Sequence, residues 1–133
     1  MIKIVDLEIK GDERGSLISL EAPIVPFEIR RTYFIFETSP DAVRGKHAHR
    51  NLEQILIAVS GSCLISTDNG IEKSQYELKT PNVGLYISGL VWREMSHFST
   101  DCVLMVLASE KYDPTDYIHE YDLFTVEAKN ART

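Results

Sequence analysis

The sequence lacks several features that define well-known classes of protein. No apolar run approaches the roughly 20 residues that cross a bilayer, and the N-terminal MIKIVDLEIKGDERG carries charges every few residues, unlike a secretory signal. Basic residues number 14 against 20 acidic ones, and the resulting net charge of -6 does not suit a nucleic-acid backbone. We therefore expect a cytoplasmic protein that binds neither membrane nor nucleic acid.

Cysteine is scarce, and no glycine-rich phosphate loop is present. The two cysteines, Cys63 and Cys102, lie in the apolar stretches GSCLIS and DCVLMVL, so we expect buried, reduced thiols rather than a disulfide or a catalytic thiol. Because neither a P-loop nor a dinucleotide-binding fingerprint occurs, a bound nucleotide would be held by side chains and strand edges.

The length of 133 residues suits a single domain over residues 1–133.

Short apolar segments rich in Ile, Val, Tyr and Phe recur along the chain, separated by Gly, Pro, Asn and Asp. This pattern is typical of β-strands and turns. The Asn-Gly pair at 69–70, between SCLIST and IEKSQYELK, predicts a hairpin. Helix signals occur only after Ser109, where Asp113 as N-cap and Pro114 predict a helix in DPTDYIHEYDLFTVEAKN. Together these features predict an all-β fold, a jelly-roll β-sandwich or small jelly-roll β-barrel, with a short C-terminal helix.

One residue separates His47 from His49 in RGKHAHRNLEQ, so on a strand the two side chains project from one face. If a single unbroken strand runs from Arg44 to Val59, Glu53 shares that face. The histidine pair can bind a metal ion or transfer protons. The alternative is a solvent-facing pair in a loop. Together with Glu53 the histidine pair offers three metal ligands, whereas in a polar cavity two imidazoles with pKa values near about 6.5 can transfer protons. We favour proton transfer, with no metal and no cofactor.

Tyr33 is a further catalytic candidate. In RRTYFIFE it shares a predicted strand face with Arg31 and Ile35, whereas Phe34 and Phe36 take the other face. A hairpin after this strand would bring the Tyr33 hydroxyl beside the histidines, where it can act as an acid or orient the substrate. The alternative is an ordinary core or rim aromatic.

Arg14, Arg44 and Trp92 are candidate substrate contacts. In an acidic protein, arginines beside a pocket are suitable partners for a phosphate or diphosphate, because a guanidinium binds such a group through two hydrogen bonds. Solvated surface charges are the alternative for both arginines. Trp92, in LVWREM, can stack on a sugar or a base, or can pack within the core.

The stretch from His47 to Gly61 resembles the first motif of the cupin superfamily, in which H-x-H-x3-E precedes a glycine. The spacing differs from the usual motif on both sides. The second cupin motif normally supplies another histidine, which is missing from the corresponding TPNVGLYISGLVWREM. Three ligands can still hold a catalytic metal, and His97 is a conceivable distant ligand.

Five segments in order resemble the cupin-fold sugar 3,4-ketoisomerases that act on dTDP-4-dehydro-6-deoxyglucose in deoxy- and amino-sugar biosynthesis. They are ERGSL, PFEIRRTYFI, RGKHAHRNLEQILIAVSGSCLISTDNG, VWREMSHFSTDCVLMVLAS and YDPTDYIHEYDLF. The resemblance implies a homodimer, a dTDP-sugar in the barrel mouth and no metal requirement. It also implies that His47 and His49 transfer protons beside Tyr33, and that Arg14 and Arg44 contact the substrate.

The implied reaction moves a ketone from C4 to C3 through an enediol, so it needs an acid and a base but no nicotinamide. Other functions remain open: a metal-dependent cupin enzyme, a 3,5-epimerase of the same sugar, or a non-catalytic sugar-nucleotide binding domain. The C4 configuration of the product also stays open, because Glu13 lies in a segment that varies within the resembling family. The sequence does not indicate which histidine removes the C3 proton.

Overall fold

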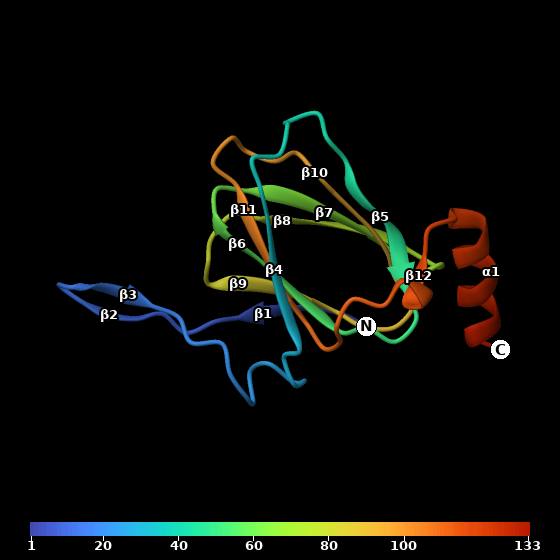
Figure 1. Ribbon diagram of the computed structural model, residues 1–133, viewed down its shortest axis with the longest axis horizontal. Helices are drawn as coiled ribbons and strands as arrows, with labels where there is room; N and C mark the ends of the chain where they lie inside the picture. The colour runs from blue at the N-terminus through green and yellow to red at the C-terminus, as the bar shows by residue number, and fades with distance from the viewer.

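The computed structural model describes residues 1–133 and contains two five-stranded antiparallel sheets that face each other (Figure 1). The first sheet consists, in order, of β1 (Ile2–Asp6), β9 (Val83–Ile87), β6 (Gln54–Ser60), β11 (Val103–Ala108) and β4 (Arg31–Phe36). The second consists of β12 (Tyr117–Ile118), β5 (Arg44–His49), β10 (Trp92–Ser96), β7 (Cys63–Asp68) and β8 (Lys73–Leu78). A separate hairpin contains β2 (Lys10–Asp12) and β3 (Gly15–Leu17), and the helical segments are η1 (Pro114–Asp116) and α1 (Tyr121–Ala131).

The core lies between the two sheets and confirms the predicted all-β jelly roll with its C-terminal helix. Leu56 and Leu104 of the first sheet pack in one cluster with Ile65 and Met95 of the second. No ladder of hydrogen bonds joins the sheets, so of the two predicted forms they make the sandwich and do not close into a barrel. The predicted hairpin is present, because β7 pairs with β8 around the Asn-Gly turn.

Strand β6 is apolar on both faces, as its sequence predicts, and each face is covered. Leu56 and Ala58 belong to the core between the sheets, whereas Ile55 and Ile57 belong to a second cluster, which includes Val25, on the outer face of the first sheet. Burying both faces of a strand accounts for its continuous apolar sequence. The outer cover is therefore supplied by the chain itself.

Residues 44–59 do not form the single unbroken strand that would place Glu53 on the face of the histidines, because the chain passes from one sheet to the other between β5 and β6. The amide of Arg50 donates to the carbonyl of Asp116, and the amides of Asn51 and Leu52 donate to its carboxylate. These bonds hold the turn. They also direct Glu53 away from the face that carries the histidines.

The predicted helix begins later than expected. Asp113 does act as an N-cap, accepting from the amide of Thr115, but it caps only the 3-10 turn η1. The chain then pairs as β12 with β5, which places Ile118 opposite Ala48. Ile118 is fully buried there, with 1% of its surface exposed. The α-helix starts only at Tyr121 and covers the outer face of the second sheet through Phe124 and Ala128.

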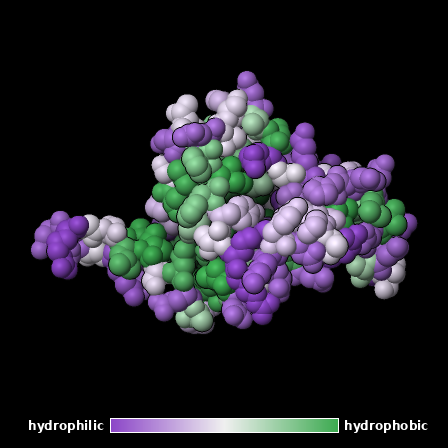
Figure 2. Space-filling model, in the orientation of Figure 1, coloured by the Kyte–Doolittle hydropathy of each residue, from purple (hydrophilic) through white to green (hydrophobic).

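The hairpin of β2 and β3 projects from the end of the molecule opposite α1 (Figure 1). Ile9, which precedes the hairpin, and Leu17, the last residue of β3, are 51% and 58% exposed, and Figure 2 shows apolar surface where the hairpin joins the body. Phe34 and Phe36 on the edge strand β4 are also exposed, as the predicted strand alternation requires. Exposed apolar side chains on this scale are characteristic of surfaces that bind another protein chain.

Cys63 and Cys102 are free and buried, as predicted. None of the helices has the length and apolar character required to span a bilayer.

Candidate active site

Two adjoining cavities, of about 680 Å³ and about 260 Å³, lie at one end of the space between the sheets. Arg31 and Tyr117 line both of them. His49 lines the larger cavity and His47 the smaller one. A single elongated molecule can therefore lie across Arg31 and Tyr117 and meet both histidines.

The two imidazoles lie side by side on β5, with ring centroids 4.7 Å apart and ring planes nearly perpendicular. Tyr117 on the neighbouring β12 lies against both, at 4.9 Å from His47 and 4.3 Å from His49 between ring centroids. The ring of His119 stacks on Tyr117 and lies 6.0 Å from His47. The histidine pair is thus part of a compact group of four polar aromatic rings.

A bulge in β5 sets the direction of His47. Gly45 and Lys46 both have positive φ angles, 81° and 55°, and the register with β10 shifts at this point. Because strict alternation would place residues three apart on opposite faces, the bulge lets Arg44 and His47 line the same cavity. Added at Gly45, a Cβ would lie 2.9 Å from the carbonyl oxygen of Arg93, which explains the glycine.

Both histidines are electrically neutral at neutral pH. Burial, reinforced by the positive charge of Arg93, lowers the pKa of His47 to about 4 and that of His49 to about 2. Burial also lowers the pKa of Arg93 to about 10, which still leaves this guanidinium charged near neutrality. The imidazoles are therefore held in the form that accepts a proton.

Asp116 contacts His49 from the side. Its Oδ2 atom lies 3.4 Å from Nδ1 of His49, and neither ring nitrogen of His49 has a hydrogen-bond partner within the protein. A carboxylate at Nδ1 favours the tautomer that carries its proton there. The Nε2 atom is then the nitrogen that can accept a proton from a substrate.

Arg31 differs from its neighbour Arg30 in having no acidic partner. Arg30 binds the carboxylates of Glu28 and Glu110, whereas the Nε atom of Arg31 is buried without any hydrogen-bond partner. The Arg31 guanidinium lies over the ring of Tyr33, 5.1 Å from its centroid, and 5.8 Å from that of Tyr112. An ordered cation without a counter-ion in a cavity is suited to binding an anion.

Four of the six residues proposed from the sequence meet at this site. Tyr33, Arg44 and His47 line the smaller cavity, and His49 is adjacent to His47. Tyr33 arrives from β4 of the opposite sheet, and not through the hairpin with β5 that the sequence suggested.

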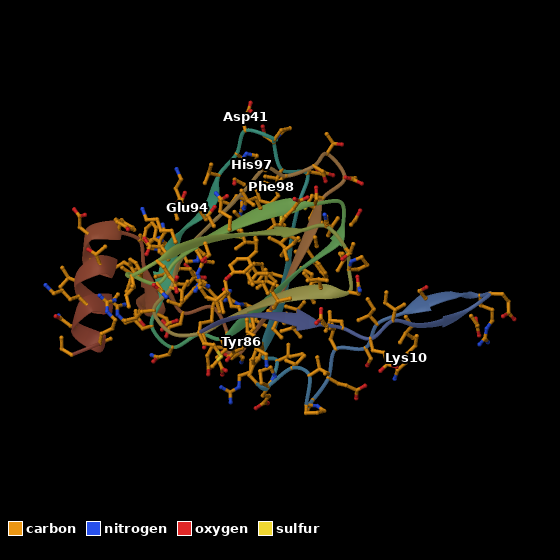
Figure 3. The ribbon with its side chains drawn as sticks, turned by 180° about the vertical axis from the view of Figure 1, so that it is seen from behind. Lys10, Asp41, Tyr86, Glu94, His97 and Phe98 are labelled. Atoms are coloured by element: carbon orange, nitrogen blue, oxygen red, sulfur yellow. The ribbon has the colours of Figure 1, made fainter.

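The structure does not bring Arg14 or Trp92 to this cavity. Arg14 lies at the turn of the β2–β3 hairpin, where its guanidinium binds the carboxylate of Asp12. Figure 3 shows Lys10 of this hairpin far from Tyr86 and Glu94 in the body. Trp92 lies on the face of β10 that packs against α1, and its indole N–H donates to the Glu94 carboxylate.

The cupin-motif glutamate does not join the histidines. The carboxylate of Glu53 accepts a hydrogen bond from the hydroxyl of Tyr86, whose side chain lies on the outer face of the first sheet. His97, the other conceivable ligand, is exposed and contacts Ser96. No group of three or more His, Cys, Asp or Glu side chains is placed to hold a metal ion.

Sequence reasoning missed five polar residues of the site: Arg31, Gln54, Arg93, Asp116 and Tyr117. The sequence could have indicated Arg31, because strand alternation places it on the same face as Tyr33. Asp116 and Tyr117 were assigned to a helix, which concealed the pairing of β12 with β5. Gln54 and Arg93 are buried polar residues, each next to a glutamate in LEQIL and VWREM, and no local pattern marks either side chain as functional.

A jelly-roll sandwich with paired histidines, a tyrosine and arginines in its cavity defines a protein of the cupin class. The family described as FdtA: WxcM-like, C-terminal, matches residues 1–129, and the chain belongs to that family. The chain is 47% identical over 123 residues to TDP-4-oxo-6-deoxy-alpha-D-glucose-3,4-oxoisomerase from Aneurinibacillus thermoaerophilus, covering 92% of this chain and 88% of that protein.

Solved structures of 3,4-ketoisomerases have the same fold. WlaRB, a TDP-quinovose 3,4-ketoisomerase from Campylobacter jejuni, is 50% identical with a TM-score of 0.91, covering 94% of this chain and 97% of that one. A His-to-Asn mutant of the 3,4-ketoisomerase QdtA from Thermoanaerobacterium thermosaccharolyticum, in complex with TDP-4-keto-6-deoxyglucose, is 43% identical with a TM-score of 0.94. That match covers 97% of this chain and 94% of the other.

Proposed function

We propose that this protein is an isomerase that moves the keto group of dTDP-4-dehydro-6-deoxyglucose from C4 to C3, within deoxy- or amino-sugar biosynthesis. The observation that carries the proposal is a pair of neutral imidazoles, 4.7 Å apart, in the cavity of a chain that belongs to the FdtA family. Moving a ketone to the neighbouring carbon requires groups that remove and return protons at adjacent atoms. Two imidazoles held as bases meet that requirement.

The proton balance of the reaction involves no external oxidant. One imidazole removes the proton on C3, which the C4 carbonyl acidifies, and the C4 oxygen gains a proton as the enediol forms. The hydroxyl on O3 then loses its proton, while the protonated imidazole system returns one to C4. Tyr33, which lines the same cavity as His47, assists at the developing enolate oxygen. Each positioned acid or base of this kind accelerates a reaction by about 10²–10⁴-fold.

Charge and cavity size support the orientation of the substrate. The smaller cavity, with Tyr33, Arg44 and His47, would take the sugar. The diphosphate would lie against Arg31, whose guanidinium has no acidic partner, and the nucleoside would extend into the larger cavity. This arrangement needs neither a metal nor another cofactor, and it leaves Trp92 as a structural residue.

We further propose that residues 1–133 act as one domain within a homodimer located in the cytoplasm. The shared core between the two sheets supports one domain. The exposed Phe34, Phe36 and Leu17 support a partner subunit, because such apolar side chains are suited to an interface. The two free cysteines are consistent with a reducing compartment.

Proton NMR of the protein with dTDP-4-dehydro-6-deoxyglucose in D2O, with and without EDTA, tests the proposed reaction. We expect a 3-keto sugar that carries deuterium at C4, at the same rate in both samples. Exchange of the C5 proton would indicate an epimerase, and loss of the reaction in EDTA would indicate a metal enzyme. Line broadening without exchange would leave a sugar-nucleotide binding protein.

A further inference from the structure

Gln54 connects Tyr33 of the candidate site to a buried arginine. Its side chain is 3% exposed and lies between the two sheets at the start of β6. The Nη1 atom of Arg93 donates to the Gln54 Oε1 atom at 2.5 Å, and the Gln54 Nε2 atom donates to the Tyr33 hydroxyl at 3.1 Å. Arg93 is itself anchored, because its Nε and Nη2 atoms both donate to the carbonyl of Val91.

The guanidinium determines which way the Gln54 amide faces. Amide oxygen and nitrogen have nearly the same shape, so hydrogen-bond partners must decide the orientation. A guanidinium offers only donors, and turning the amide over would place its NH2 group against them. The oxygen of Gln54 must therefore face Arg93, and its NH2 group must face Tyr33.

This orientation also decides what the Tyr33 hydroxyl can do. Its oxygen accepts from Gln54, and no hydrogen bond of the structure uses the hydroxyl proton. A phenol has one proton and can accept two hydrogen bonds, so Tyr33 satisfies Gln54 without giving up that proton. Tyr33 lines the small cavity beside His47, where a ligand is the available acceptor. Burial raises the pKa of Tyr33 above its usual value, which keeps the proton on the phenol near neutral pH.

We infer that Gln54, fixed by Arg93, is a positioning residue that directs the Tyr33 proton at the substrate oxygen that becomes negatively charged. The inference rests on the proposed ketoisomerase function and gives that reaction its hydrogen-bond donor. In the first proton transfer the C4 carbonyl oxygen takes up negative charge. A donor that already points into the cavity stabilises this charge without first being turned round.

Gln54→Glu tests the polarity of this hydrogen-bond chain with little change of shape. The new carboxylate still accepts from Arg93, but it also accepts from the Tyr33 hydroxyl and so draws the proton away from the cavity. We expect kcat for the dTDP-sugar to fall about 10²-fold, as when an oxyanion donor is lost. KM should stay within about twofold, because substrate binding is unaffected, and the thermal unfolding midpoint should not decrease, since Arg93 keeps its partner.

A double-mutant cycle with Tyr33→Phe separates this mechanism from a general effect of added charge. Once the hydroxyl is gone, Gln54→Glu should lower kcat no further, whereas a charge effect on the histidines would persist in Tyr33→Phe. Gln75→Glu adds the same charge at an exposed position on β8 and should retain wild-type kcat. The inference is overturned if Gln54→Glu keeps wild-type kcat, or if it slows Tyr33→Phe as strongly as the wild type. Wild-type protein without any isomerase activity would instead overturn the proposed function.

Discussion

At the scale of single residues, burial decides the protonation of the histidines and hence their chemistry. The pKa of His47 is lowered to about 4 and that of His49 to about 2, first by burial and then by the charge of Arg93. A free imidazole would be half protonated near a pH of about 6.5 and would lose its capacity as a base below that value. In this site both rings stay unprotonated well into the acid range.

The pH dependence of catalysis should follow these lowered pKa values. We expect kcat/KM for the dTDP-sugar to stay level from pH 8 down to about 5, because this parameter reports the ionisation of the free enzyme. Initial rates across that range, together with NMR titration of the imidazole protons, measure it. A decline with an apparent pKa near about 6.5 would contradict the lowered values.

The same shifts predict how acid affects stability. Between about pH 6.5 and the folded-state pKa values, the unfolded chain binds protons on these histidines that the folded protein does not. Stability is therefore complete above the unfolded value and decreases as the pH falls through this window. The thermal midpoint of the wild type should decrease more between pH 6.5 and 5 than that of His49→Asn, whose side chain does not titrate. Equal decreases in both proteins would contradict the assignment for His49.

Residue type and spacing in the sequence identify much of the candidate site. His47, His49, Tyr33 and Arg44 could be identified because His-x-His and strand alternation place chemical groups on one face. Arg93 and Gln54 could not, because their role comes from contact with each other across the sandwich, 39 positions apart in sequence. Only the packing of the two sheets reveals that contact.

At the scale of elements, the bulge in β5 positions the site. Its residue Gly45 has a φ of 81°, and the space for a Cβ is closed by the Arg93 carbonyl at 2.9 Å and the Met95 Cε atom at 3.0 Å. A side chain here must either shift β10 or remove the bulge. Either change would turn Arg44 and His47 away from their shared cavity.

Gly45→Ala should therefore impair both stability and activity. Placing Ala in left-handed backbone costs about 1–2 kcal/mol, and the close contact adds to that cost. We expect a lower denaturant midpoint and a kcat reduced at least about tenfold, measured by chemical unfolding and by initial rates. Gly70→Ala, in the β7–β8 turn with a φ of 91°, is a control that should lose stability but keep kcat. Equal kcat in the two variants would contradict a role for the bulge in positioning His47.

Some elements of the fold could be predicted from the sequence and others could not. The β7–β8 hairpin was predictable because Asn-Gly favours a local turn. The bulge and β12 were not, because both depend on pairing with strands that lie far away in sequence. In DPTDYIHEYD, the helix-start signal of Asp113 and Pro114 produces only a single 3-10 turn. The chain does not continue as a helix, because Tyr117 and Ile118 pair with β5 instead.

At the scale of the whole molecule, the position of Arg14 argues for a second chain. Arg14 lies on a hairpin that projects from the body, at the opposite end from α1, and in its own chain it does not line either cavity (Figure 1). Ile9 and Leu17 at the base of the hairpin are exposed, as are Phe34 and Phe36 on the edge strand β4. In a dimer these apolar groups can cover each other, and each hairpin can then carry Arg14 to the site of the other subunit.

Mixed dimers of two inactive variants test this arrangement. In a dimer of one Arg14→Ala chain and one His49→Asn chain, the site of the first chain has intact histidines and receives Arg14 from the second. If each variant alone is nearly inactive, unfolding and refolding an equal mixture should restore about a quarter of wild-type activity, because half of the dimers are mixed and each has one complete site. Sedimentation should show dimers throughout. If Arg14 acts within its own chain, every site in the mixture lacks one group and no activity returns, and a monomer in sedimentation would contradict the dimer itself.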